Sequence, residues 1–216
     1  MFQLESAGVV DLDLMENPKL RSLLGLWTAL QEKNALPRLG CLDPRQLGEN
    51  LGRTHLIQVM APGKFRFLMY GADVTNTGAK SMAGLTTDDY DDQGFAAMVK
   101  EHYQEIVTLR RPICREIKGT RKGAPYRYLR LGLPFSSEGQ RVDFLLVGNH
   151  PVELPQELFE TRQGDNKGYL AGLMADVTSN LDRLRRGFDK GQVQEMRHSG
   201  TALLWNIAAM KGRERG

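Results

Sequence analysis

The first regular pattern along the chain is an apolar stripe that predicts a helix near the N-terminus. Five apolar residues recur there at helical spacing, at Leu20, Leu23, Leu24, Trp27 and Leu30. The pair Asn17-Pro18 stands just before the stripe. Asparagine can accept hydrogen bonds from the first amides of a helix, and proline suits the first helical position because no donor is needed there. We therefore expect a helix from Pro18, then a loop and a short helix over Pro44–Asn50.

Runs of β-branched, aromatic and leucine residues predict strands in the middle of the chain. Five such runs lie at His55–Met60, Phe65–Tyr70, Ile113–Thr120, Tyr126–Phe135 and Arg141–Asn149. A longer helix is expected over Asp91–Arg110, because Pro112 disfavours helix in the residue before it. Short connections between the strands imply antiparallel pairing. The expected fold class is α+β, with one five-stranded antiparallel sheet and helices on one face.

One predicted strand shows a clear alternation that indicates which of its faces is buried. Its apolar positions are Leu129, Leu131, Leu133 and Phe135, and the residues between them include Tyr128, Arg130 and Gly132. Because successive side chains of a strand point to opposite faces, we expect the leucine-bearing face to be the buried one.

The C-terminal part is predicted to be a helical extension with an apolar seam. Six apolar residues alternate at spacings of four and three, at Leu170, Met174, Val177, Leu181, Leu184 and Phe188. Such a seam must be covered by the sheet, by another helix or by a second chain. We expect these six residues and Trp27 to form interfaces; whether the C-terminal helices pack in cis or in trans stays open. The predicted units are 1–52 (flanking helix and connector), 53–152 (core) and 153–216 (extension).

Composition narrows the classes of partner. The net charge of +3 on 216 residues does not call for a polyanionic partner, and no nucleic-acid-binding motif is present. The two cysteines, Cys41 and Cys114, are far apart and suggest neither a disulfide framework nor a metal site, which fits a reducing compartment. No uncharged apolar run reaches roughly 18 residues, so no membrane span is expected. The N-terminus has no basic region typical of a secretory signal, and the expected location is the cytoplasm.

Several short motifs occur in an order that resembles a PAS domain. They include Leu36-Pro37-Arg38, Asp43-Pro44, the run from Phe65 to Gly71 and the run from Leu131 to Phe135. The resemblance extends from about Leu23 to Val152, and more narrowly is similar to a divergent family of single-domain PAS proteins common in alphaproteobacteria. It implies a fold that holds a small molecule or a protein partner between the sheet and the longer helix. It carries over no catalytic residue.

His102 is the most prominent candidate for chemistry in this pattern. It shares one face of the longer helix with Phe95, Val99, Ile106 and Leu109. Three interpretations stay open: a buried histidine hydrogen-bonded in the core, contact with a non-haem ligand, and axial ligation of a haem, which some PAS sensors achieve with a histidine on this helix. The candidate ligand-binding residues are His102 and six apolar residues of the predicted helix and strands: Phe67, Met69, Met98, Ile106, Leu131 and Phe144.

Other cofactor sites find less support. A flavin adduct needs a cysteine on the helix after the second strand, and Gly71–Tyr90 contains none. The acidic cluster Asp88, Asp89, Asp91 and Asp92 lacks the spacing of a calcium loop. We expect these carboxylates to cap the following helix instead, at the positive end of its dipole. No metal site and no catalytic residue are predicted.

Three functions are compatible with these patterns. The first is a regulatory module that binds a small molecule or a signalling protein partner, with a homodimer as one arrangement. The second is an enzyme on a similar α+β fold, which would need several titratable residues in its pocket, whereas only His102 offers a base. The third is an adaptor whose core is filled by its own side chains. The ligand, if there is one, is left unknown by the sequence.

Overall fold

A computed structural model describes residues 2–31, 35–71, 74, 82–121 and 124–153 of the chain. The strands are β1 Phe2–Val10, β2 Thr54–Ala61, β3 Lys64–Met69, β4 Ile113–Arg121, β5 Ala124–Phe135 and β6 Phe144–Glu153. The helices are α1 Pro18–Leu30 and α3 Gln93–Leu109, with 3-10 helices at Leu39–Cys41 (η1), Pro44–Arg53 (η2) and Thr87–Asp89 (η3). The α+β class and the five predicted strands are confirmed. Among the described residues, no helix is long and apolar enough to cross a membrane.

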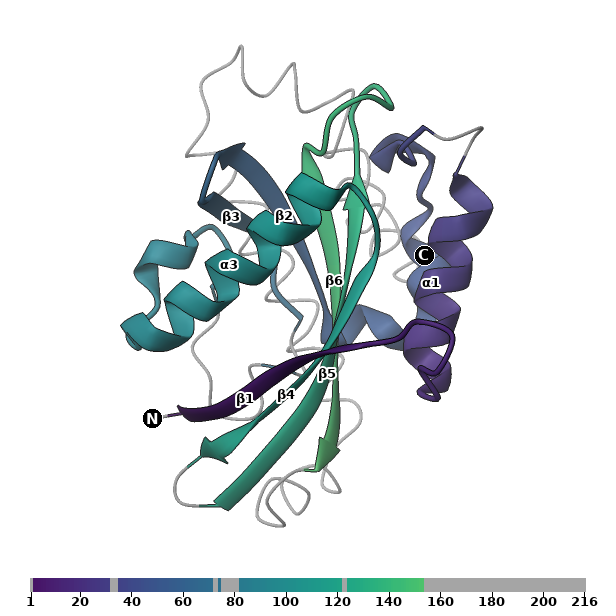
Figure 1. Cartoon of the computed structure of the whole chain (residues 1–216). Helices are drawn as coiled ribbons and strands as arrows, with labels where there is room; N and C mark the ends of the chain where they lie inside the picture. Colours follow the sequence, from purple (N-terminus) through teal and green to yellow (C-terminus); the bar gives the residue numbers. More distant parts are fainter. Residues whose placement is uncertain (1, 32–34, 72–73, 75–81, 122–123, 154–216) are drawn as a thin grey trace, which may run out of the picture.

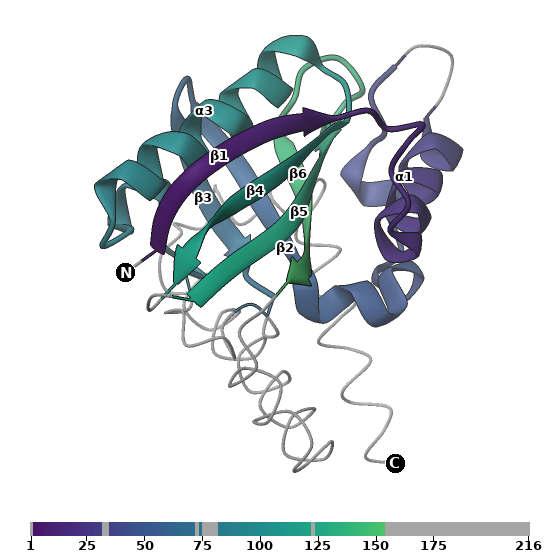
Figure 2. The ribbon, with the colours of Figure 1, turned by 60° about the horizontal axis from the view of Figure 1, so that its bottom comes forward.

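The strands form one antiparallel sheet in the order β1-β4-β5-β6-β2-β3. The predicted count of five strands was one too low, because β1 adds a sixth at the edge beside β4 (Figure 2). The alternation of β1 is broken by a register shift between Leu4 and Ser6, and Val9 is 64% exposed. A half-exposed edge strand with an irregular register lacks the regular period that identifies a strand in sequence.

Both long helices start where their capping residues predict. The side chain of Asn17 accepts hydrogen bonds from the amides of Lys19 and Leu20, both at 3.1 Å, and Pro18 opens α1. The Asp92 side chain accepts from the amide of Phe95 at 3.0 Å and caps α3. The predicted short helix beginning at Pro44 is present as η2, with Gly48 in a non-helical conformation within it.

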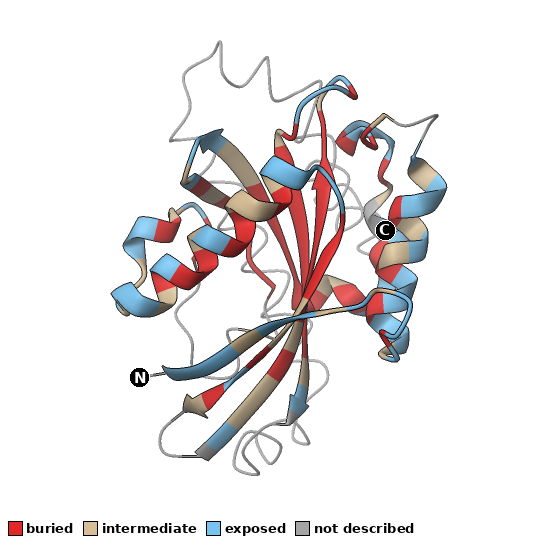
Figure 3. Cartoon of the chain, viewed as in Figure 1, coloured by how far each residue is buried: buried red, intermediate tan, exposed pale blue. Residues whose placement is uncertain are grey.

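The sheet is covered on both faces, which differs from the predicted arrangement with helices on one face. Figure 1 shows α3 on one side of the sheet and α1 on the other. A Cβ added at Gly132 of β5 would lie 2.2 Å from Cδ1 of Ile106 on α3. A Cβ added at Gly148 of β6 would lie 2.7 Å from Cδ1 of Leu23 on α1. Glycines at these two points let each helix approach the sheet closely. Figure 3 shows that buried residues follow one another along the central strands.

Trp27 attaches α1 to the sheet within the same chain. Its side chain is 5% exposed, and its indole N–H donates to the carbonyl of Pro134 at 2.7 Å. Its side chain is therefore held inside the fold, and the predicted subunit contact at Trp27 stays a prediction. The six residues of the predicted C-terminal seam, Leu170 to Phe188, lie outside the described residues.

Replacing Gly71 with alanine is expected to lower the free energy of unfolding by about 1–3 kcal/mol. The added Cβ would lie 2.5 Å from the carbonyl oxygen of Gly52 and 2.9 Å from the amide nitrogen of Thr54, both backbone atoms that cannot rotate away. Urea denaturation measures the change. Gly25→Ala is the matched control: Gly25 lies in α1 with no atom near an added Cβ, so alanine there should stabilise the protein by about 0.5–1 kcal/mol. Equal effects at the two positions would contradict the close packing at Gly71.

Candidate functional site

The candidate site lies between α3 and the face of the sheet that α3 covers. Arg130 of β5 is at its centre and is only 6% exposed. Alternation along β5 places Arg130 on the same face as Gly132, which packs against Ile106 of α3. A guanidinium at this depth stays protonated, because its pKa is far above neutrality.

Neutral groups contact the guanidinium of Arg130 from three sides. Its Nε donates to Oδ1 of Asn149 at 3.2 Å, and one terminal nitrogen donates to the hydroxyl of Tyr128 at 2.8 Å. The other terminal nitrogen lies 3.5 Å from Nδ1 of His102 on α3. The guanidinium carbon is also 5.9 Å from the ring centroid of Phe95 and of Tyr103, and 5.4 Å from that of Tyr128. Aromatic faces attract a cation without neutralising it.

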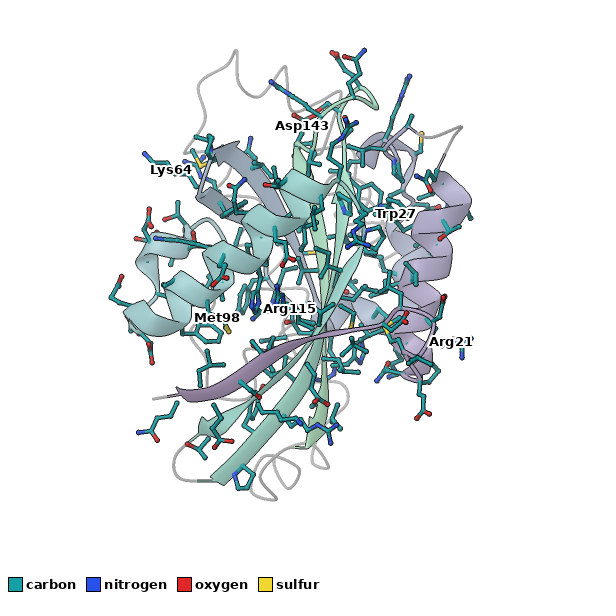
Figure 4. All side chains as sticks on the ribbon, viewed as in Figure 1. Arg21, Trp27, Lys64, Met98, Arg115 and Asp143 are labelled. Atoms are coloured by element: carbon teal, nitrogen blue, oxygen red, sulfur yellow. The ribbon has the colours of Figure 1, made fainter. Side chains whose placement is uncertain are left out.

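Three residues from adjacent strands form a transverse row under α3, which we call the donor row: Arg115, Arg130 and Asn149. Arg115 of β4 is directly opposite Arg130, and Asn149 of β6 is opposite it on the other side. Opposite residues of neighbouring strands point to the same face. Arg115 forms an ion pair with Glu105 of α3 and donates to the carbonyl of Ala7 on β1 at 3.2 Å. Figure 4 shows Arg115 in the space between α3 and the sheet.

Two histidines beside this row are held in the neutral form. Burial, with the charge of Arg130 as a further cause, lowers the pKa of His102 and of His55 to about 3. His55 of β2 accepts a hydrogen bond at Nδ1 from the amide of Gly71 at 3.0 Å, and its ring stacks on Tyr70 at 3.9 Å. The role of His55 is therefore to hold the chain where it leaves β3.

Aromatic rings of β3 and the following segment pack against His55. Phe67 of β3 makes edge contacts with Tyr70, Tyr90 and Tyr103 at centroid distances of 5.4, 5.9 and 6.5 Å. Burial raises the pKa of Tyr70 to about 12 and raises those of Tyr103 and Tyr128 as well. These phenols are neutral at physiological pH, so none of them supplies a negative charge to the site.

The predicted ligand-binding residues divide between the two faces of the sheet. His102, Met98 and Ile106 share the inner face of α3, and Phe67 lies against Tyr103 of that helix. Leu131 and Phe144 face α1 instead, because Leu131 is paired with Gly148, and Phe144 lies on the same face of β6 as Gly148. Met69 is paired with Leu56, which is paired with Leu146 on that same side. These three residues therefore lie on the face of the sheet that α1 covers, away from the space under α3.

Sequence reasoning missed Arg130, Arg115 and Asn149 altogether. For Arg130 the signal was the polar half of the alternation in β5, whose leucine-bearing half was predicted to be the buried face. Leu109 was predicted on the inner face of α3 but is 45% exposed at the end of the helix. Tyr103, which was not predicted there, is buried on that face.

Within the acidic cluster before α3, Asp92 has the predicted capping role, whereas Asp88 and Asp89 have other partners. Asp92 caps α3, and the Asp89 carboxylate accepts from the amide of Thr86 at 2.8 Å. Asp88 forms an ion pair with Lys100 on the next turns of α3. Among the described residues, no group of three or more histidine, cysteine, aspartate or glutamate side chains is placed to hold a metal ion.

The position of His102 restricts how it could hold a haem. Its Nδ1 faces the guanidinium of Arg130, which only donates hydrogen bonds, so Nδ1 is the acceptor and the proton is on Nε2. An axial bond to iron would have to use Nε2 after that proton is lost. Burial raises the pKa of the other buried nucleophile, the Cys114 thiol, to about 12, so this cysteine is a packed apolar side chain.

A family model described as PAS domain matches residues 15–146. A search of curated proteins found no match. Among solved structures, the chain is similar to that of a single-substitution variant of RsLOV, with 12% sequence identity and a TM-score of 0.37, covering 91% of this chain and 99% of that one.

Proposed function

We propose that this chain, which belongs to the PAS domain family, is a sensory module that binds a small molecule between α3 and the sheet. The observation that carries the proposal is the buried polar cluster around Arg130 and His102 in that space. A protein interior filled for stability alone is normally apolar, since burying a charge costs free energy unless it is paired. A retained charge under α3 therefore supports a binding role.

The module is proposed to signal through protein–protein contact and not through catalysis. The two histidines of the site have pKa values of about 3, too low for a general base that works near neutral pH by exchanging a proton. The predicted apolar seam in residues 153–216 is the proposed contact for a signalling partner or a second copy of the chain. Within this proposal the protein is a cytoplasmic, bacterial member of the single-domain PAS family.

The physical link between ligand and output is α3. A ligand can shift a conformational equilibrium only as far as it binds one state better than the other. Glu105 of α3 is paired with Arg115 of β4, and Arg115 also contacts β1. If a ligand displaces α3, this displacement would therefore be transmitted through Arg115 to the β1 edge of the sheet.

Native mass spectrometry of the protein purified from its own source tests the proposal. We expect a non-covalent small molecule that is lost on denaturation, and visible absorption would identify it as a coloured cofactor such as haem. Hydrogen exchange should then show faster exchange in α3 once the molecule is removed. A bare polypeptide mass, with α3 exchange unchanged by small-molecule extract from the same cells, would favour the adaptor function instead.

A further inference from the structure

Among the described residues, the buried guanidinium of Arg130 has no anionic partner. The ion pairs among the described residues involve other cations, and the polar partners of Arg130 are an amide, a phenol and an imidazole. Removing a charge from water costs several kcal/mol when no opposite charge compensates it. Of its five N–H groups, two have no acceptor among the described residues.

The rest of the donor row leaves the positive charge of Arg130 uncompensated and adds further hydrogen-bond donors without acceptors among the described residues. Arg115 stands directly opposite Arg130, and like charges in that position repel each other. Glu105 is the acidic partner of Arg115, so two guanidinium groups and one carboxylate leave one positive charge. Two further buried donors have no acceptor among the described residues, Nε of Arg115 and Nδ2 of Asn149, one on each side of Arg130.

We propose that the donor row, Arg115, Arg130 and Asn149, binds the anionic group of a small monocarboxylate, whose apolar body packs among the rings of α3 and β5. This inference rests on the proposed function and assigns a chemical class to its ligand. A guanidinium binds a carboxylate through two parallel hydrogen bonds, and the unpartnered N–H of Asn149 supplies a third. One negative charge matches the single positive charge left on the row.

The surroundings favour a carboxylate on an apolar body over a small inorganic anion. Phe95, Tyr103 and Tyr128 surround the guanidinium with rings. A phosphate dianion would bring more charge than the row can neutralise, since His55 and His102 remain neutral beside it. Benzoate is therefore the probe, with benzamide as its uncharged analogue and inorganic phosphate as the alternative anion.

The experiment measures the melting temperature and the dissociation constant of the full chain with each probe. Benzoate is expected to raise the melting temperature in a concentration-dependent way, while benzamide and phosphate leave it nearly unchanged. Arg130→Met should weaken benzoate binding by about 100-fold or more, because the buried charge partner is gone. Arg127→Met is the matched control: Arg127 lies on the same strand, is 41% exposed and is paired with Glu116, so it should leave benzoate binding unchanged.

Asn149→Asp provides a second variant that does not depend on losing the arginine. The new carboxylate would lie in the position of Oδ1, 3.2 Å from Nε of Arg130, and would act as a built-in counter-ion. We expect it to raise the melting temperature of the ligand-free protein and to abolish the response to benzoate. A benzoate response retained in both Arg130→Met and Asn149→Asp would overturn the assignment of the row.

The outcomes separate failure of this inference from failure of the proposed function. If benzoate has no effect on the wild-type chain while native mass spectrometry finds a neutral retained molecule, the anion site is wrong and the sensory function stands. If phosphate binds more tightly than benzoate, the carboxylate class is wrong. If no probe binds and no molecule is retained, both proposals fail.

Discussion

Lowering the pH from about 7 to about 5 is expected to reduce the free energy of unfolding by about 2 kcal/mol for each of His55 and His102, or about 4 kcal/mol together. Each imidazole has a pKa of about 3 in the folded protein, mainly because burial disfavours its charged form. In the unfolded chain the pKa returns to about 6.5. Between these two values the unfolded state binds one more proton per histidine, so stability is complete above about pH 6.5 and is lost as the pH falls toward 3.

Urea denaturation at several pH values between 7 and 5 measures this slope, in a range where most carboxylates stay ionised. His102→Gln should remove about half of the slope that the two histidines contribute, because glutamine does not titrate. His55→Gln should remove a similar share, although it also disturbs the hydrogen bond from the Gly71 amide to His55. A slope that is the same in wild type and in both variants would show that the two histidines are not buried as described.

The same pH series also tests whether an anion binds at the donor row. The positive charge of Arg130 is the second cause of the low pKa of both histidines, after burial. An anion bound at Arg130 would offset this charge and raise both pKa values toward neutrality. Saturating benzoate should therefore make the fall in stability between pH 7 and 5 shallower.

The fold was largely predictable because its elements carry strong local signals. Asn17-Pro18 and Asp92 specify the starts of both long helices through side-chain caps, and Pro112 limits the end of α3. The strands β2 to β6 were predicted from their β-branched and aromatic runs. β1 was missed because an edge strand with one neighbour and a register shift shows no steady alternation.

The site was harder to predict because both faces of the sheet are buried. In a sheet open on one side, the alternation of Leu131 and Leu133 with Arg130 would place the arginine in water. Here α1 covers the leucine-bearing face and α3 covers the other, so a charged residue at a position that normally faces solvent is 6% exposed. The packing of α3 against this face of β5 is what buries Arg130, and no local pattern in β5 records it.

His102 was identified from its place in an apolar stripe, but its main partner was not. The helical period places His102 on the inner face of α3, which the structure confirms with 4% exposure. The residue that it meets, Arg130, is 28 positions away and depends on the register of β5 against α3. The sequence of a helix shows on which of its faces a residue lies. It does not show which residue of another element packs against that face.

Replacing Trp27 with alanine is expected to lower the free energy of unfolding by about 3–5 kcal/mol. The indole is buried between α1 and the sheet, and its removal leaves a large cavity and an unpaired carbonyl at Pro134. Trp27→Phe keeps most of the apolar volume and loses the hydrogen bond, so it should cost about 1–3 kcal/mol. Thr28→Ala, at an exposed position on the same helix, should change the stability by less than about 0.5 kcal/mol.

Protein concentration distinguishes packing within the chain from a subunit contact at Trp27. If the indole holds α1 to its own sheet, the loss in Trp27→Ala is the same at low and high concentration, and the oligomeric mass of the folded protein does not change. If Trp27 also joins two copies, the melting temperature of the wild type rises with concentration, and the variant loses that dependence. Because the Pro134 carbonyl already takes the indole N–H at 2.7 Å, we expect the first result, which would leave residues 153–216 as the segment in which to look for a dimer contact.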